Sequence, residues 1–282
     1  MKNVFLISPS GHLSKEKFNN SLKNLKKWGF GRIKYLKSIN SKFYYYAGDY
    51  ERRYNEVNQA YKDEETEIVF CARGGMGAVQ LISFLDYNMI RKSGKVLIGF
   101  SDATILLNSI YQKTSLRCLH GPMPCNKNYD RKTISCLHMA LNKEDYSVRI
   151  NEKDVFKEGF AKAKIVGGAI RVLVKSLGGE HEIQTSDKIL FLEQNHWRGR
   201  DIYDALWQLK LAGKFKKVKG IILGYFTKCD EPVLNYLKDF FKDFKCPIIF
   251  NQPIGHKEPN LTIPIGEICI INTEKLSWQI KF

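Results

Sequence analysis

Short apolar runs alternate with helical patterns through the first half of the chain, and this alternation constrains the fold more than any other feature. The runs 4–7, 67–71 and 96–100 have the length and composition of strands. Between them, residues such as Phe18 and Leu25 recur at helical spacing, and we expect a further helix, bearing residues from Val79 to Leu85, directly after the glycine turn at 73–77. Strands that are buried on both faces and alternate with helices form a parallel sheet. We therefore predict a flavodoxin-like or Rossmann-like α/β domain.

The second half of the chain is less regular, and a length of 282 residues favours two domains. The texture becomes polar and charged between about residues 126 and 161. We predict an N-terminal α/β domain over 1–130, a linker over 131–160 and a C-terminal α/β domain with a mixed or barrel-like sheet over 161–282. In that domain we expect a Gly-Gly turn at 167–168, strands at 188–192, 220–224 and 247–250, helices at 201–212 and 232–244, and a closing antiparallel pair at 268–271 and 276–280.

Composition excludes several classes of protein. Charged residues make up 26% and the hydrophobic set 44%, which excludes a disordered chain. No apolar run approaches the roughly 18 residues that span a bilayer, so no membrane association is expected. Residues 1–11 read as a strand and turn rather than a secretory signal, which favours the cytoplasm. The seven cysteines include no C-x-x-C pair, so we expect reduced thiols and no metal site.

The chain carries 45 Lys and Arg against 29 Asp and Glu, a net charge of +16. Nucleic-acid binding would require these cations on one face. They are instead scattered, with the densest clusters at 23–27 and 214–219. We interpret them as a solvated basic surface and expect no nucleic acid, with attraction to an anionic polymer or substrate as the open alternative.

Two turns follow the central strands of the first half, where a parallel sheet places its sites. Ser101 stands between a strand and a helix, as the nucleophile of a nucleophile elbow does, although Ala103 replaces the second glycine of G-x-S-x-G. The alternative is that Ser101 only caps the helix. The turn 73–77 has three glycines, whose N–H groups can converge on an anion. We interpret it as an oxyanion donor.

A serine nucleophile requires a base and an acid that orients the base. His256 lies in a loop rich in Gly and Pro just after a strand, and His120 is its rival at another strand end. Glu193 ends the apolar run 189–192, where a carboxylate is seldom found without a partner.

These residues stand in motifs that resemble the serine LD-carboxypeptidases, the muramoyltetrapeptide carboxypeptidases, a family that includes the microcin C self-immunity peptidases. The resemblance extends over nearly the whole chain, in order. Its motifs are Tyr46-Ala47-Gly48-Asp49 with Glu51-Arg52-Arg53, residues 70–77, 98–104, 120–122, 189–193, 220–224, 253–256 and 260–266.

The resemblance implies that Ser101 is the nucleophile, His256 the general base and Glu193 the acid that orients the base. It implies that the N–H groups of Gly75 and Asp102 form the oxyanion hole. It further implies a cytoplasmic homodimer without cofactor. The substrate would be a murein tetrapeptide, cut between the L-centre of its diamino acid and the terminal D-alanine during peptidoglycan recycling.

The chain departs from the family around the predicted site. Gly167-Gly168-Ala169 stands where many members have Gly-Gly-Asn, and an aromatic and basic loop follows Glu193. Trp197 and Arg198 in that loop, and Arg73, are candidate substrate-binding residues. We expect Arg73 or an arginine of the loop to bind the terminal carboxylate of the substrate. One alternative is an immunity-type amidase that cleaves aminoacyl or peptidyl nucleotides, with Trp197 stacking on the base. Another is a non-catalytic basic binding module.

Overall fold

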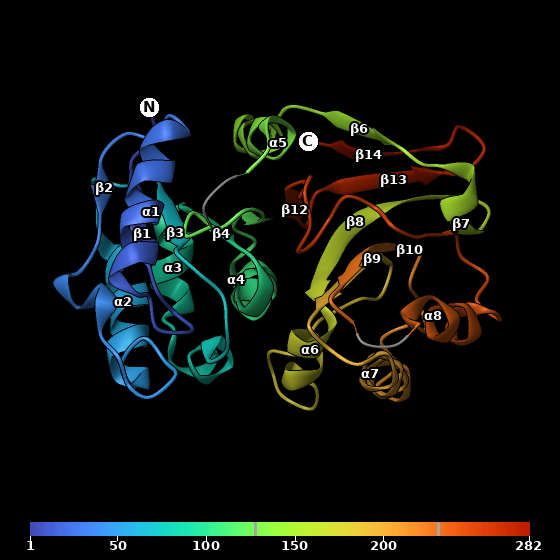
Figure 1. The fold of residues 1–282 in the computed structure, drawn as a ribbon, viewed down its shortest axis with the longest axis horizontal. Helices are drawn as coiled ribbons and strands as arrows, with labels where there is room; N and C mark the ends of the chain where they lie inside the picture. The colour runs from blue at the N-terminus through green and yellow to red at the C-terminus, as the bar shows by residue number, and fades with distance from the viewer. Residues whose placement is uncertain (127–128, 230–231) are drawn as a thin grey trace. The chain divides into compact units, whose positions relative to one another are not determined.

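The computed structural model describes residues 1–126, 129–229 and 232–282. The chain forms two compact units, Met1–Ile134 (unit 1) and Ser135–Phe282 (unit 2), and each is described by itself (Figure 1). Residues 131–160, predicted as a linker, carry a helix and two strands. The predicted domain boundaries remain a prediction.

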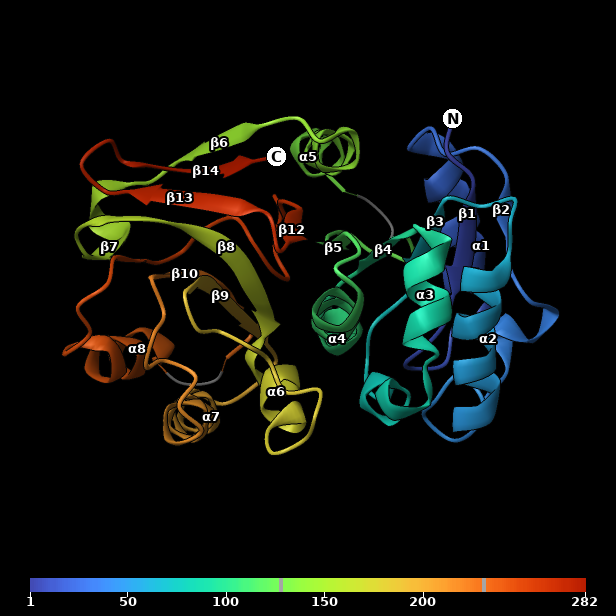
Figure 2. The ribbon, with the colours of Figure 1, turned by 180° about the vertical axis from the view of Figure 1, so that it is seen from behind.

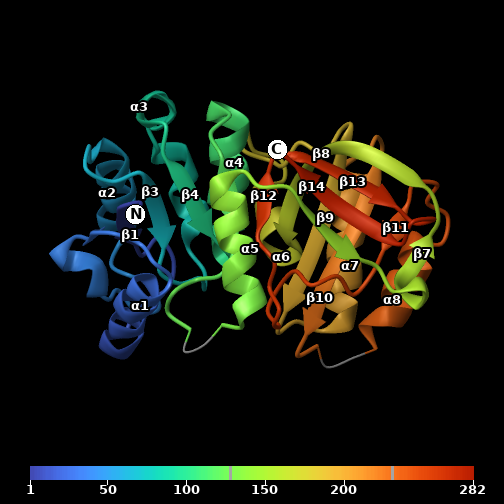
Figure 3. The ribbon, with the colours of Figure 1, turned by 90° about the horizontal axis from the view of Figure 1, so that it is seen from above.

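Unit 1 is built on a parallel sheet in which the strands follow the order β5-β4-β3-β1-β2. Helices α2, α3 and α4 contact one another in series on one face, and α1 lies on the other face (Figure 3). This confirms the predicted parallel α/β architecture. The strands are β1 (Val4–Ile7), β2 (Ile33–Lys34), β3 (Ile68–Cys71), β4 (Val96–Gly99) and β5 (Cys118–His120), and the helices are α1 (Lys15–Lys27), α2 (Tyr50–Lys62), α3 (Tyr87–Ser93), α4 (Thr104–Thr114) and α5 (Arg131–Asn142), which continues into unit 2.

Local sequence signals explain where these elements begin. Ser14 caps α1 by accepting a hydrogen bond from the Lys17 N–H at 3.3 Å, and Asp49 caps α2 by accepting one from the Arg52 N–H at 2.8 Å. All four residues of β3 are 0% exposed, as expected for a strand covered by helices on both faces.

The predicted helix after the glycine turn is wrong. Residues 78–84 form two short 3₁₀ turns, η2 (Ala78–Gln80) and η3 (Ile82–Phe84), and α3 begins only after the cap Asp86. Leu85, which ends η3, has extended backbone with φ of −75° and ψ of 135°, so no continuous helix leads into α3. Apolar residues of this segment, such as Leu81 and Leu85, are buried as expected, but in compact 3₁₀ turns rather than in an α-helix.

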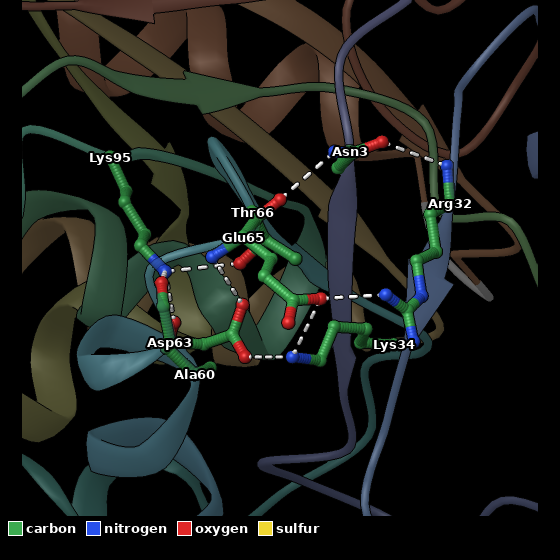
Figure 4. Close-up of polar contacts among 8 residues, drawn as sticks. All are labelled: Asn3, Arg32, Lys34, Ala60, Asp63, Glu65, Thr66 and Lys95. Carbon is green, nitrogen blue, oxygen red and sulfur yellow. Dashed lines mark hydrogen bonds and ion pairs between the residues drawn. The ribbon is translucent and has the colours of Figure 1, made fainter.

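A network of polar side chains lies at the amino edge of the unit 1 sheet, the edge at which its strands begin (Figure 4). The ammonium of Lys95, just before β4, donates to the carbonyl oxygens of Ala60 and Asp63 and to Thr66 Oγ1. It thereby satisfies carbonyls at the C-terminal end of α2. Lys34 pairs with the Asp63 carboxylate, and Arg32 pairs with Glu65 at the surface.

Unit 2 contains a mixed sheet with the order β6-β14-β13-β8-β9-β10-β11-β7, and helices α6, α7 and α8 lie along one side of it (Figure 2). The order has β6 at one end and β7 at the other, so among the described residues the sheet is open, and of the predicted alternatives the mixed sheet is right. The strands of this sheet are β6 (Tyr146–Arg149), β7 (Val155–Lys157), β8 (Phe160–Ala169), β9 (Lys188–Asn195), β10 (Gly220–Thr227), β11 (Ile248–Ile249), β13 (Ile268–Asn272) and β14 (Ser277–Lys281). The short strand β12 (Ile263–Ile265) is not part of this sheet, and the helices are α6 (Ile170–Leu173), α7 (Gly199–Leu211) and α8 (Val233–Phe241).

The predicted Gly-Gly turn is also wrong, because Gly167 and Gly168 lie inside β8. Both have φ near 140°, and a Cβ built on Gly167 would lie 1.9 Å from the Phe191 carbonyl oxygen. The glycines therefore let β8 approach β9 closely. The closing antiparallel pair is confirmed as β13 and β14, which run from Ile268↔Lys281 to Asn272↔Ser277.

Two further observations concern the whole of the described chain. None of its helices is long and apolar enough to cross a membrane. Five of the seven cysteines are buried, and burial raises the pKa of thiols such as Cys118 and Cys269 well above the ordinary value.

Candidate active site

Ser101 lies directly after β4, in a strained backbone conformation. Its φ is 58°, a left-handed value that is uncommon for a serine. Phe100 before it is extended, and α4 begins at Thr104 after the short 3₁₀ turn Ser101–Ala103. This is the geometry of a nucleophile elbow, in which a sharp strand-to-helix turn presents the hydroxyl. A helix cap has extended backbone instead, so the conformation favours the nucleophile interpretation.

The glycine turn after β3 packs directly against this serine. A Cβ built on Gly74 would lie 3.0 Å from Ser101 Cβ and 3.2 Å from Ser101 Oγ, so a larger residue there would press on the hydroxyl. Gly75 follows with φ of 122°. Asp102, 1% exposed, accepts a hydrogen bond from the Ala78 N–H at 2.8 Å. The carboxylate of Asp102 thus ties the glycine turn to the serine turn.

Two arginines of α2 support these turns, and reasoning from sequence gave them no separate role. Arg53 is 1% exposed and donates to the carbonyl oxygens of Pro9 at 3.1 Å and Gly77 at 3.0 Å. Burial lowers the pKa of this guanidinium. Arg52 donates to Ser8 O at 3.2 Å and to Glu56 at 2.5 Å. The sequence signal for these two arginines was the family motif at residues 46–53, which contains both.

In unit 2, Glu193 and His256 form a hydrogen-bonded pair. His256 Nδ1 lies 2.8 Å from Glu193 Oε2. The Glu193 side chain is 0% exposed and the His256 side chain is 20% exposed. Because a carboxylate accepts, Nδ1 carries the proton in this pair and Nε2 is left as the basic nitrogen. The predicted pairing of these two residues across 63 positions is therefore present.

The loop that carries His256 is held by backbone hydrogen bonds. Tyr225 N–H, in β10, donates to Ile254 O at 2.7 Å, and Gly255 N–H donates to Asn260 Oδ1 at 2.9 Å. A Cβ on Gly255 would lie 3.2 Å from Glu193 Oε2, so the glycine allows the loop to pass close to the carboxylate. These contacts fix the imidazole ring next to its acid.

The rival base, His120, occupies a different environment. It is 0% exposed at the end of β5, and its ring packs edge-on against Phe100 with centroids 5.0 Å apart. A general base must reach its substrate, and the partly exposed ring of His256 meets that requirement better.

The candidate substrate-binding residues lie in both units. In unit 1, Arg73 Nη1 donates to His12 O. In unit 2, the Arg171 guanidinium lies over the Trp197 ring at 5.7 Å, and Arg198 pairs with Asp201 at 2.8 Å in the first turn of α7. Arg198 is thus engaged locally. Within the described ranges, no group of three or more His, Cys, Asp or Glu side chains is placed to hold a metal ion.

Comparison with known families gives two matches. The model described as the LD-carboxypeptidase N-terminal domain matches residues 4–121, and the model described as the LD-carboxypeptidase C-terminal domain matches residues 162–271. The predicted serine lies in the first match and the predicted acid and base in the second.

Similar proteins extend over almost the full chain. A probable murein peptide carboxypeptidase of Bacillus subtilis (strain 168) is 29% identical over 99% of this chain and 91% of its own. A murein tetrapeptide carboxypeptidase of Pseudomonas aeruginosa is 26% identical over 98% of this chain and 94% of its own. Among solved structures, the microcin C7 self immunity protein MccF in complex with aspartyl sulfamoyl adenosine is 22% identical, with a TM-score of 0.90 over 100% of this chain and 96% of that chain, which shows a shared fold.

Proposed function

Because the chain belongs to the LD-carboxypeptidase family, we propose that it is a serine peptidase that removes the terminal D-alanine from murein tetrapeptides during peptidoglycan recycling. The bond cut joins the L-centre of the diamino acid to D-alanine. Ser101, His256 and Glu193 act as a catalytic triad, and unit 1 and unit 2 must both contribute to it.

The reaction proceeds through an acyl-enzyme. Ser101 Oγ attacks the scissile carbonyl while His256 Nε2 takes the hydroxyl proton, and the N–H groups of Gly75 and Asp102 stabilise the oxyanion. The histidine then gives that proton to the nitrogen of the leaving D-alanine, and the C–N bond breaks. A water molecule, deprotonated by the same histidine, hydrolyses the ester and restores Ser101.

The observation that carries this proposal is the pair formed by His256 and the fully buried Glu193, with 2.8 Å between Nδ1 and Oε2. The carboxylate holds the ring in one tautomer and stabilises the imidazolium that forms during attack. The left-handed Ser101 turn supplies the matching nucleophile in unit 1.

The direct test is release of D-alanine from a purified murein tetrapeptide. Wild-type protein is expected to release it in the presence of EDTA. Ser101→Ala and His256→Ala are each expected to lose turnover by several orders of magnitude while remaining folded.

A double variant tests whether residues of the two units act as one catalytic group. In a triad, Ser101→Ala combined with His256→Ala loses hardly more activity than either change alone, because removal of one member already disables the others. Multiplicative losses would contradict a shared triad.

A second candidate function keeps the chemistry and changes the substrate to an aminoacyl or peptidyl nucleotide. The observation in its favour is the half-buried aromatic ring of Trp197, which precedes α7 and lies under the Arg171 guanidinium. Hydrolysis of aspartyl sulfamoyl adenosine, lost in Trp197→Ala, together with no release from the tetrapeptide, would favour this function.

Two further proposals accompany this function, namely a cytoplasmic location and a homodimer. Cell fractionation tests the first. Light scattering of the purified protein over a range of concentrations tests the second.

A further inference from the structure

Tyr45 stands at the tip of a two-residue hairpin in unit 1. The N–H of Phe43 donates to Tyr46 O at 3.0 Å, and the N–H of Tyr46 donates back to Phe43 O at 2.9 Å. Tyr44 and Tyr45 form the turn between them, and Tyr44 has a left-handed φ of 51°. Such strain in a bulky residue persists only where the surroundings hold it.

The segment that follows β1 holds this hairpin in place. His12 N–H donates to Tyr45 O at 2.9 Å, and Ala47 N–H donates to Ser10 O at 3.1 Å. His12 Nδ1 also lies 3.1 Å from Ser41 O. The backbone of the hairpin is therefore anchored at three points, and the place from which the Tyr45 side chain extends is set before any ligand binds.

The Tyr45 hydroxyl lies against the glycine turn of the predicted active site. A Cβ built on Gly75 would be 2.6 Å from Tyr45 Oη and 3.3 Å from Gly11 Cα. Ser101 Oγ stands beside the neighbouring Gly74, 3.2 Å from the Cβ that this residue lacks. The phenol and the nucleophile therefore flank the same short backbone segment, although Tyr45 itself is 43% exposed.

The Arg73 guanidinium lies beside Gly11, the residue that neighbours Gly75. A Cβ built on Gly11 would lie 3.3 Å from both Arg73 Cζ and Arg73 Nη2. Nη1 donates to His12 O, which fixes the plane of the group. A positioned cation and a neutral hydroxyl donor therefore converge on Gly11 and Gly75. A carboxylate accepts from both kinds of donor.

We propose that Tyr45 and Arg73 form the subsite for the terminal carboxylate of the peptide substrate, with the Tyr45 hydroxyl donating to one carboxylate oxygen. The inference rests on the proposed function and deepens it. A carboxypeptidase must distinguish a free chain end from an internal peptide bond, and these two donors make that distinction.

The test compares a substrate that has the carboxylate with one that lacks it. The two ligands are the murein tetrapeptide with free D-alanine and the same peptide ending in D-alanine amide. Tyr45→Phe is expected to raise KM for the free acid about tenfold or more, because a hydrogen bond to a charged group is lost. Tyr44→Phe is the matched control, since that residue is 82% exposed at the same turn, and it is expected to leave KM unchanged.

Binding to the Ser101→Ala protein keeps the test independent of turnover. Calorimetry is expected to show the free acid bound about tenfold or more weakly when Tyr45→Phe is added, and the amide bound equally well with either residue. Equal losses for acid and amide, or no loss for the acid, would overturn the carboxylate subsite alone. A wild-type protein that releases no D-alanine from the free acid would overturn the proposed function and the subsite with it.

Discussion

The two edges of the unit 1 sheet differ in how their backbone is arranged and held. At the carboxyl edge, Ser101 and Gly75 have positive φ, and the turns that carry them are held by buried groups such as Arg53 and Asp102. At the amino edge, Lys95 uses its ammonium to satisfy the carbonyls that end α2 (Figure 4). The carboxyl edge thus keeps strained backbone in a fixed geometry, whereas the amino edge provides hydrogen-bond partners for buried carbonyl groups.

Helix α2 extends from one edge to the other, with Glu56 inside it and Asp63 as its C-cap residue. Glu56 accepts from Ser8 N–H after β1, and burial raises its pKa to about 7 in spite of Arg52. Burial also acts to raise the pKa of Asp63, but hydrogen bonds from Lys34 and Thr66 outweigh it and hold that pKa below its usual value. The comparison teaches that backbone strain gathers where chemistry is expected, whereas at the opposite edge hydrogen bonds and ion pairs outweigh the burial of a charged group.

The largest effect is expected at Ser101. Both Ser101→Gly and Ser101→Ala should lose turnover on the order of 10⁴-fold or more. Glycine accepts the left-handed backbone, so Ser101→Gly should unfold with a free energy about 0.5–1 kcal/mol above that of Ser101→Ala. Urea denaturation and D-alanine release measure the two quantities. A less stable glycine variant would contradict stored strain at this turn.

Removing the ammonium at the amino edge should affect stability and spare catalysis. Lys95→Met leaves the acceptors of Ala60, Asp63 and Thr66 buried, so the free energy of unfolding should fall by about 2–3 kcal/mol. The value of kcat/KM at 25 °C should stay within about twofold, because Lys95 bonds to residues at the amino edge of the sheet, away from the serine turn. Lys92→Met, on the exposed surface, is the control. A large loss of activity in folded Lys95→Met would contradict the view that the amino edge serves stability alone.

The pH dependence of stability should carry the signature of Glu56. Its folded pKa of about 7 exceeds the ordinary 4.5, so the unfolded chain ionises first as pH rises. The contribution of Glu56 is therefore fully present below about pH 4.5 and is lost as the pH rises through about 7. The measurement is the difference in unfolding free energy between wild type and Glu56→Gln across this interval, and it should decrease. A difference that grows with pH would show that Arg52 dominates instead.

The smallest effect is expected at the exposed part of the amino edge. Arg32 and Glu65 pair at 2.7 Å, but their side chains are 68% and 56% exposed. Arg32→Ala should lower the free energy of unfolding by no more than about 0.5 kcal/mol. Thermal denaturation of Arg32→Ala and Lys95→Met side by side checks that the second variant loses more stability. Equal losses in the two variants would contradict this ranking.

Much of unit 1 could be predicted because its signals are local. The apolar runs at β3 and β4 and the caps Ser14 and Asp49 act within one or two turns of chain. The helix expected after Gly77 failed because apolar spacing is shared by helices and by compact 3₁₀ segments. In unit 2, Gly167 and Gly168 were placed in a turn because glycine signals a turn and a close strand approach equally well.

The sequence by itself determined the family, the parallel sheet of unit 1, and the residue types at the serine, acid and base positions. The tertiary structure decided the left-handed backbone of Ser101, the partners of Lys95 and the position of Tyr45 beside Gly75. These features depend on contacts between segments that are distant in the chain. Hydrophobic periodicity and capping residues are written locally, whereas the partner of a buried charge or hydroxyl is fixed only when the chain has packed.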